Sequence, residues 1–190
     1  MGSWCSTVLA RSVLAAGVLL LSACSSDSGL PRLGSVPPFR LTDQNGHDFD
    51  SSALAGHIWV ADFMFTNCPG PCPRMSSQMK HVQIMTSGAE VRLISFSIDP
   101  ERDTPETLFN YSRFYDARPG TWYFLTGPKK TIWGLSKDAF KLYVGDNYEH
   151  DTHFVLIDKH GQIRGYYQTL EEHAIDQLLA DIHSLLRERV

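Results

Sequence analysis

The sequence has no excess of basic residues. Of its 190 residues, 17 are Lys or Arg and 21 are Asp or Glu, which gives a net charge of −4 and a pI near 6.0. Proteins that bind nucleic acid through its phosphates typically carry a basic patch and a high pI. We therefore expect no nucleic-acid partner. A hydrophobic fraction of 43% and a charged fraction of 20% are typical of a globular protein rather than a disordered one.

Cysteine is also scarce, and its distribution excludes a framework of several disulfides. Cys5 and Cys24 lie in the first 24 residues, whereas Cys68 and Cys72 form a close pair. A small disulfide-rich fold would spread an even number of cysteines through the chain. The chain therefore has one cysteine pair in its interior and two cysteines near its start.

The first residues indicate an export signal. Arg11 precedes an apolar run over 13–21, which is too short to span a bilayer as a helix and matches the apolar core of a signal peptide. The run ends in Leu21-Ser22-Ala23-Cys24, which resembles the bacterial lipobox, where cleavage leaves a lipidated cysteine. We expect a lipoprotein signal peptide over 1–23. A plain signal peptide cut at a small-residue site and an uncleaved anchor are the alternatives.

The segment that follows is polar and contains Gly, Ser and Pro, so we expect a flexible tether over 24–36. Cleavage would remove Cys5 and modify Cys24. The lipid would then hold a domain over 37–190 at a membrane, facing the periplasm or another extracytoplasmic space. Its single cysteine pair is compatible with a metal site, a redox dithiol or one structural disulfide.

The pattern of the remaining chain predicts one α/β domain. A strand over 38–46 enters an Asn-Gly turn and indicates an N-terminal hairpin. Strands are further predicted over 57–65, 91–98, 122–125, 153–158 and 162–167, and helices over 72–86, from 104, over 128–138 and from about 170. Thr104 and Pro105 match the N-cap and first position of a helix. This order predicts a central mixed sheet with helices on both faces.

The Cys68-Pro69-Gly70-Pro71-Cys72 loop falls where a buried strand ends and a helix begins. The free N–H groups of a helix N-terminus favour negative charge, so we expect this position to lower a thiol pKa and favour the thiolate. The four-residue spacing brings the two sulfurs together. Two thiolates suit Cu(I) or Zn(II), but the spacing alone leaves a metal site, a redox dithiol and a structural disulfide open.

Two redox families can be tested against the sequence. A peroxiredoxin would place Thr or Ser three residues before its cysteine and Pro four residues earlier, where this chain has Phe65 and Ala61. A thioredoxin has two residues between its cysteines and a cis-proline before the strand that faces them. Residues 146–155 contain no proline, and they contain His150 and His153 instead. These differences weaken a redox function without excluding it.

A histidine in that loop would complete a metal site. If the fold is thioredoxin-like, the loop before 153–158 lies beside the cysteine loop, and an imidazole from His150 or His153 would join the two thiolates. Sulfur and nitrogen together suit copper, and three ligands leave a position open for transfer. Structural zinc would normally have a fourth protein ligand, and none is evident. Both histidines could instead be ordinary polar loop residues.

The chain resembles the Sco/SenC family of copper chaperones for cytochrome c oxidase. The resemblance rests on three segments that follow in the same order, 65–73, 97–105 and 150–161, and it extends over about 37–188. The resemblance implies a thioredoxin-like fold that binds one copper ion, Cu(I) or Cu(II), through Cys68, Cys72 and one histidine. His150 matches that ligand by its separation from Gly161, which leaves His153 as an accessory candidate. Asp99 matches an acidic position that could orient the site or meet the partner.

The resemblance implies two functions. As a metallochaperone, the domain would deliver copper to the dinuclear copper centre of cytochrome c oxidase or to a related membrane protein. As a thiol-disulfide oxidoreductase, it would reduce the cysteines of that centre, with Cys68 attacking and Cys72 resolving. We favour the first and expect a monomer. Gly70 and Pro71 differ from the residues most common between the two cysteines in this family. The identity of the recipient protein therefore stays open.

Overall fold

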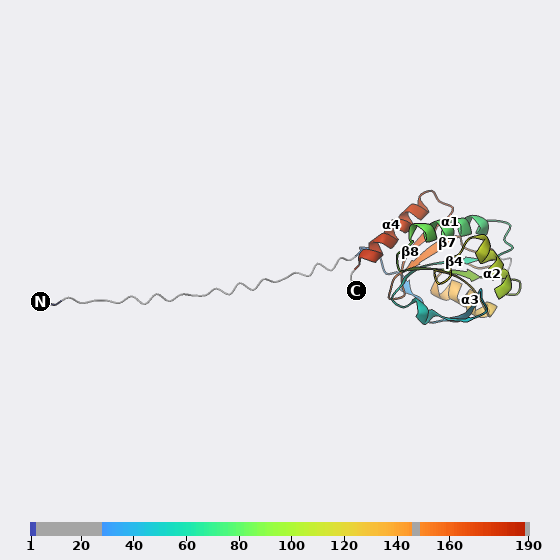
Figure 1. Ribbon diagram of the computed structural model, residues 1–190, viewed down its shortest axis with the longest axis horizontal. Helices are drawn as coiled ribbons and strands as arrows, with labels where there is room; N and C mark the ends of the chain where they lie inside the picture. The colour runs from blue at the N-terminus through green and yellow to red at the C-terminus, as the bar shows by residue number, and fades with distance from the viewer. Residues whose placement is uncertain (3–27, 146–148, 189–190) are drawn as a thin grey trace.

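The structure is a computed structural model that describes residues 1–2, 28–145 and 149–188 (Figure 1). Apart from residues 1–2, the signal sequence predicted over 1–23 lies outside the described residues, and so does the predicted lipidation site Cys24. Among the described helices, none combines the length and the apolar character of a membrane-spanning segment.

Strands of both directions form one mixed sheet in the order β1-β8-β7-β4-β5-β6-β2-β3. The pairs β4–β5 and β5–β6 are parallel, and the remaining neighbours are antiparallel. The strands are β1 (Gly34–Ser35), β2 (Arg40–Asp43), β3 (Asp48–Asp50), β4 (Ile58–Met64), β5 (Val91–Ser97), β6 (Trp122–Thr126), β7 (His153–Ile157) and β8 (Gln162–Gln168). The predicted mixed sheet and the N-terminal hairpin, β2–β3, are confirmed.

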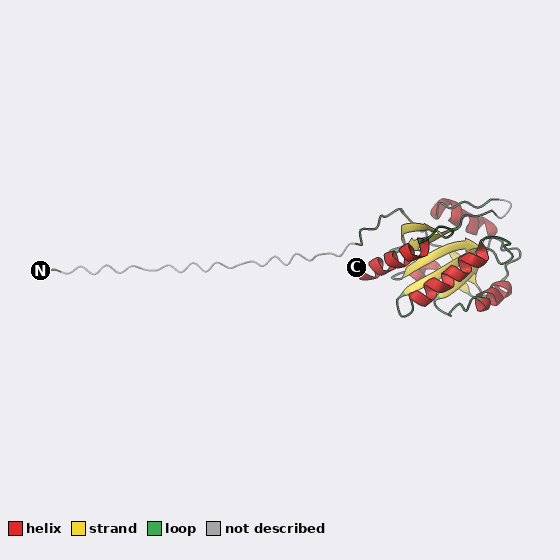
Figure 2. Ribbon diagram, turned by 90° about the horizontal axis from the view of Figure 1, so that it is seen from above, coloured by secondary structure: helices red, strands yellow, loops and turns green. Residues whose placement is uncertain are grey.

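Helices cover both faces of the sheet, as predicted (Figures 1 and 2). The helices α1 (Cys72–Met85) and α4 (Ala174–Arg187) lie side by side on one face. On the other face lie α3 (Lys129–Gly134) and the π-helical turn η2 (Leu135–Ala139). Phe140, directly after this turn, packs edge-on against Trp59 and Phe63 of β4. Helix α2 (Pro105–Phe114) packs beside β6, and the short η1 (Ser51–Leu54) follows β3.

Local sequence signals explain several of the element boundaries. The Thr104 hydroxyl accepts a hydrogen bond from the Thr107 amide, and Pro105 occupies the first turn of α2, as predicted. The last helix begins at Ala174 rather than near 170, because His173 adopts a left-handed conformation (φ 66°) immediately before it. A left-handed residue cannot be part of a right-handed helix.

Strand β1 was not anticipated, because its two residues fall in the segment predicted to be a tether. Gly34 pairs with Ile163 and Ser35 with Gln162 at the edge of the sheet. The Leu33 amide donates to the Ile163 carbonyl (2.8 Å), and the Val36 amide donates to the Gly161 carbonyl (3.0 Å). The chain therefore joins the sheet before residue 37.

All seven residues of β4 are buried, and one of them is the acidic residue Asp62. Burial raises the pKa of the Asp62 carboxyl to about 7, and the hydroxyl of Ser95, which pairs with it from β5, offsets only part of this effect. The folded protein therefore holds a proton on Asp62 at a pH where the unfolded chain has lost it.

The Asp62→Asn variant should remove a pH dependence of stability. Because the pKa of Asp62 is raised from 3.8 in the unfolded chain to about 7 when folded, the folded protein binds more protons over this interval. Its stability therefore falls as the pH rises through it. Each pKa unit corresponds to about 1.4 kcal/mol, so the wild type should lose up to about 4 kcal/mol relative to Asp62→Asn. Urea unfolding at several pH values across this interval measures the difference.

Asp48→Asn, which changes an exposed carboxylate on β3, is the matched control and should leave the pH dependence of the wild type unchanged. Equal slopes of unfolding free energy against pH in the wild type and Asp62→Asn would contradict the assignment of a raised pKa to this carboxyl.

Candidate metal centre

The cysteine loop connects the carboxyl end of β4 to the start of α1. Strand β4 ends at Met64, and Cys72 is the first residue of α1. Pro71 occupies the N-cap with φ −75°, and Pro73 lies in the first turn, where fixed φ angles and missing N–H donors suit a helix start. Cys72 is fully buried, Cys68 is partly exposed, and both thiols are free.

His150 reaches the buried cysteine from the loop before β7. Its Nε2 atom lies 3.2 Å from Cys72 Sγ. A bridge between Val144 and His150 shapes the loop, together with a hydrogen bond from the Asp151 amide to the Tyr143 carbonyl (3.0 Å). The ring also lies edge-on to Phe65, with centroids 5.9 Å apart. The imidazole is thus held against the sulfur by backbone and side-chain contacts.

The ligand atoms of Cys68, Cys72 and His150 all lie within 4.8 Å of one another. Among the residues that the structure describes, no other group of three His, Cys, Asp or Glu side chains converges in this way. Two sulfurs and one nitrogen at this spacing can surround a single metal ion. This donor set fits copper, which accepts thiolate and imidazole ligands together.

Hydrogen bonding sets the tautomer of His150. Its Nδ1 atom lies 2.8 Å from the backbone carbonyl of Asp151, and because a carbonyl only accepts, Nδ1 carries the proton. The lone pair of Nε2 is then directed at Cys72. Burial lowers the pKa of His150, which favours the neutral ring. A neutral imidazole whose other nitrogen donates to a carbonyl is the usual form of a metal-binding histidine.

The expectation that the helix N-terminus lowers the thiol pKa is wrong for Cys72. Burial raises the pKa of this thiol well above its usual range, and the neighbouring Cys68 and the Asp62 carboxyl raise it further. Loss of solvation therefore outweighs the partial positive charge of the helix end at this position. Metal binding must displace a proton from Cys72, which couples metal affinity to pH.

The other two predicted site residues lie outside this ligand group. Asp99 is buried just after β5, and its carboxylate lies 2.9 Å from Arg102 Nε. His153, the first residue of β7, contacts the carboxylate of Asp151 through Nδ1 and lies edge-on to Tyr166. The structure thus brings His150, but not His153, to the two cysteines.

A buried carboxylate that the sequence did not reveal holds the cysteine loop in place. Asp103 is 1% exposed and accepts hydrogen bonds from the Thr66 amide (3.0 Å), the Thr66 hydroxyl (2.5 Å) and the Ser97 hydroxyl (2.5 Å). Thr66 precedes Cys68 by two residues, so Asp103 ties the loop to the end of β5. The signal that could have indicated it is the third acidic residue in the turn over 99–103, after Asp99 and Glu101.

A second set of hydrogen bonds ties α1 to the loop of His150. Gln78 Nε2 in α1 donates to the Thr169 carbonyl (2.8 Å), and the Thr169 hydroxyl donates to the Thr152 carbonyl (2.6 Å). Thr169 is fully buried, so water does not compete with these bonds. The helix that carries Cys72 and the loop that carries His150 are therefore fixed relative to each other.

Comparison with known proteins identifies the family. A family model described as SCO1/SenC matches residues 30–187. The chain belongs to the SCO1/SenC family. A SCO1/SenC family lipoprotein from Bacillus anthracis str. Ames is 33% identical to it with a TM-score of 0.74, over 80% of this chain and 95% of that one.

Two further solved Sco structures are similar. BsSco, described as a member of the Sco family of cytochrome c oxidase assembly proteins with a disulfide switch, is 32% identical with a TM-score of 0.73, over 80% of this chain and 94% of that one. Copper-bound ScoI from Bradyrhizobium japonicum is 26% identical with a TM-score of 0.67, over 80% and 99%. These similarities confirm the predicted thioredoxin-like fold.

In this SCO1/SenC protein, Asp103→Ala should lower the free energy of unfolding and increase the mobility of the cysteine loop. The change leaves the partly buried amide and hydroxyl of Thr66 and the buried hydroxyl of Ser97 without their acceptor, and an unsatisfied buried group typically costs about 1–3 kcal/mol. Chemical denaturation should show a lower free energy of unfolding, and hydrogen exchange should show faster exchange of the Thr66 amide.

Glu101→Ala, in the same turn but exposed, is the control and should change neither quantity measurably. Retention of wild-type stability and slow Thr66 exchange in Asp103→Ala would show that the carboxylate does not hold the loop.

Proposed function

We propose that this chain is an extracytoplasmic copper carrier that holds one copper ion through Cys68, Cys72 and His150. The observation that carries the proposal is the convergence of the three ligand atoms within 4.8 Å. Two thiolates and a neutral imidazole suit copper, and the related ScoI of Bradyrhizobium japonicum binds copper. A structural zinc site would normally have a fourth protein ligand, and none joins the group among the described residues.

The site has features suited to releasing its cargo. Three protein ligands leave a coordination position open, through which a ligand from a recipient can enter. Cys68 is partly exposed whereas Cys72 is fully buried, so an incoming ligand approaches from the side of Cys68. Reprotonation of Cys72, which its raised pKa favours, then assists departure of the ion.

The proposed recipient is cytochrome c oxidase, at its dinuclear copper centre. This assignment is supported by the description of BsSco as an oxidase assembly protein. The proposed location is the extracytoplasmic face of a membrane, with a signal peptide over 1–23, a lipid on Cys24 and a monomeric domain. The predicted domain boundary at residue 37 moves toward the N-terminus, because Ser28 and Gly34–Ser35 already contact the domain. The description of the Bacillus anthracis relative as a lipoprotein supports the lipid anchor.

A second candidate function is thiol-disulfide exchange, which the two free thiols and the disulfide switch of BsSco support. In this reaction the Cys68 thiolate attacks a disulfide of the recipient and displaces one thiolate. Cys72 then attacks the mixed disulfide and releases the second thiol. The recipient is reduced, and the pair Cys68–Cys72 is oxidised to a disulfide.

Titration of the reduced domain with Cu(I) in competition with a chelator tests the first function. The wild type should bind one equivalent, and His150→Ala should bind copper more weakly. Loss of a residue that only supports a ligand typically lowers metal affinity about 10–100-fold, so loss of the ligand itself should lower it by at least about 100-fold.

His153→Ala is the matched control and should keep wild-type affinity, because this imidazole contacts Asp151 rather than the sulfurs. The same variants separate the two functions, since His150→Ala should retain most of its exchange rate with a small disulfide. Failure of the reduced wild type to bind one equivalent of copper would overturn the carrier proposal.

A further inference from the structure

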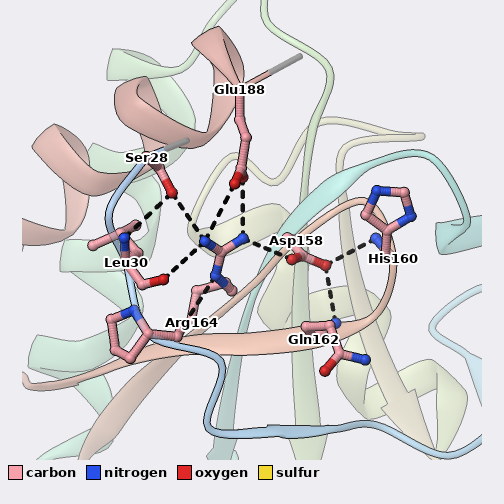
Figure 3. A network of polar contacts seen from close by, with 8 residues as sticks. Ser28, Leu30, Asp158, His160, Gln162, Arg164 and Glu188 are labelled. Atoms are coloured by element: carbon pink, nitrogen blue, oxygen red, sulfur yellow. Dashed lines mark hydrogen bonds and ion pairs between the residues drawn. The ribbon is translucent and has the colours of Figure 1, made fainter. Parts of the chain in front are cut away.

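A buried arginine ties the N-terminal segment to the domain (Figure 3). Arg164 in β8 is 2% exposed. Its Nη1 atom donates to the carboxylates of Asp158 (2.8 Å) and Glu188 (3.0 Å). Its Nε and Nη2 atoms donate to backbone carbonyls of the N-terminal segment, those of Pro31 (3.0 Å) and Leu30 (3.0 Å). Such a charge-assisted network is strong when it is buried and fully satisfied.

The network joins three parts of the chain that are far apart in the sequence. Besides the carbonyls, Arg164 Nη2 donates to the Ser28 hydroxyl (2.9 Å). Asp158 lies in the turn between β7 and β8, and Glu188 directly follows α4. Together with β1, these contacts fix the chain to the domain from Ser28 onward.

This clamp lies at the opposite end of the sheet from the cysteines. Strand β4 pairs antiparallel with β7, with Trp59 opposite Ile157. Asp158 and the clamp are therefore at the amino end of β4, whereas Cys68 follows its carboxyl end. A seven-residue strand separates the two ends by about 20 Å, because each residue advances by about 3.3 Å.

The stretch of sequence between the predicted lipid and the clamp is short. If Cys24 carries the lipid, only residues 25–27 separate it from Ser28. Four consecutive residue steps span at most about 14 Å when fully extended. This reach is smaller than the distance between the two ends of the sheet, so the domain cannot turn its cysteines to the lipid surface.

We propose that the end of the domain formed by Ser28–Arg32, Asp158–His160 and Glu188, the anchor pole, faces the membrane and that the metal site faces away from it. The inference rests on the proposed lipid anchor at Cys24 and adds an orientation to the proposed function. The recipient must then present its copper-accepting site well above the lipid surface, on a part that projects from the membrane. Exposed Arg32 and partly exposed Lys159 give the anchor pole cations that can meet anionic headgroups.

Energy transfer to headgroup-labelled lipids in vesicles tests this orientation in the lipidated full chain. A fluorescent non-canonical residue replaces Lys159 at the anchor pole or, in a second sample, Glu101 in the exposed turn after β5. We expect several-fold more transfer from position 159 than from position 101. Equal transfer from the two positions in vesicle-bound protein, or more from position 101, would overturn the proposal.

Two changes, Arg164→Gln and a longer tether, test whether the clamp and the short tether cause this orientation. Arg164→Gln should free residues 28–31 and reduce the difference between the two labels, and hydrogen exchange at Leu33 and Val36 should accelerate. Arg40→Gln, which removes a highly exposed arginine from β2, is the control and should change neither the label difference nor the hydrogen exchange.

Insertion of about 20 Gly and Ser residues before Ser28 leaves the clamp intact but lengthens the reach by up to about 70 Å. It should therefore also abolish the difference in energy transfer between the two labels. A difference that persists with the insertion would overturn the role of the short tether.

Copper stoichiometry, measured on the same samples, distinguishes a failure of the proposed orientation from a failure of the proposed carrier function. The Arg164→Gln variant should still bind one equivalent, because its site is about 20 Å from the clamp. A wild-type chain that binds copper but does not associate with vesicles would overturn the anchor and the orientation together while leaving copper binding intact. A vesicle-bound chain with the expected label difference but no copper would support the orientation and overturn the carrier function.

Discussion

The contact between Cys72 Sγ and His150 Nε2, at 3.2 Å, is the constraint on which the site depends, because the two residues come from elements 78 positions apart. Cys72 is placed by the end of β4 and the start of α1, and His150 by the loop that leads into β7. Antiparallel pairing of β4 with β7 brings these elements to the same edge of the sheet. The hydrogen bonds of Asp103 hold the cysteine loop, and the hydrogen bond of Gln78 holds α1 against the loop of His150.

Burial gives this contact its electrostatic character. It raises the pKa of Cys72 and lowers that of His150, so the site without metal favours a neutral thiol beside a neutral imidazole. A metal ion reverses this preference for the thiol, since the thiolate is the ligand form. The proton on Cys72 therefore competes with the ion, which suits a protein that must both hold and release copper.

The sequence predicted the parts of the fold that arise from local patterns. The apolar runs around β4 and β5 predicted buried strands, and Thr104 with Pro105 predicted the start of α2. The family resemblance, rather than composition or spacing, distinguished His150 from His153 as the expected ligand. What could not be predicted depends on contacts between distant residues. Strand β1 has two residues without periodicity and is held by pairing with β8, and Asp103 acts on a loop 37 positions away. The raised pKa of Cys72 reflects its complete burial, which the helix N-terminus in the sequence does not reveal.

The ligand group and the Arg164 clamp lie at opposite ends of one buried strand. The ligand group follows the carboxyl end of β4, and the Arg164 clamp lies at its amino end, so a change at one end need not disturb the other. X-ray absorption at the copper edge of the copper-loaded chain tests the central claim most directly. The account predicts a first shell of two sulfurs and one nitrogen, with the nitrogen lost in His150→Ala and kept in His153→Ala. A first shell without sulfur, or a nitrogen that persists in His150→Ala, would contradict it.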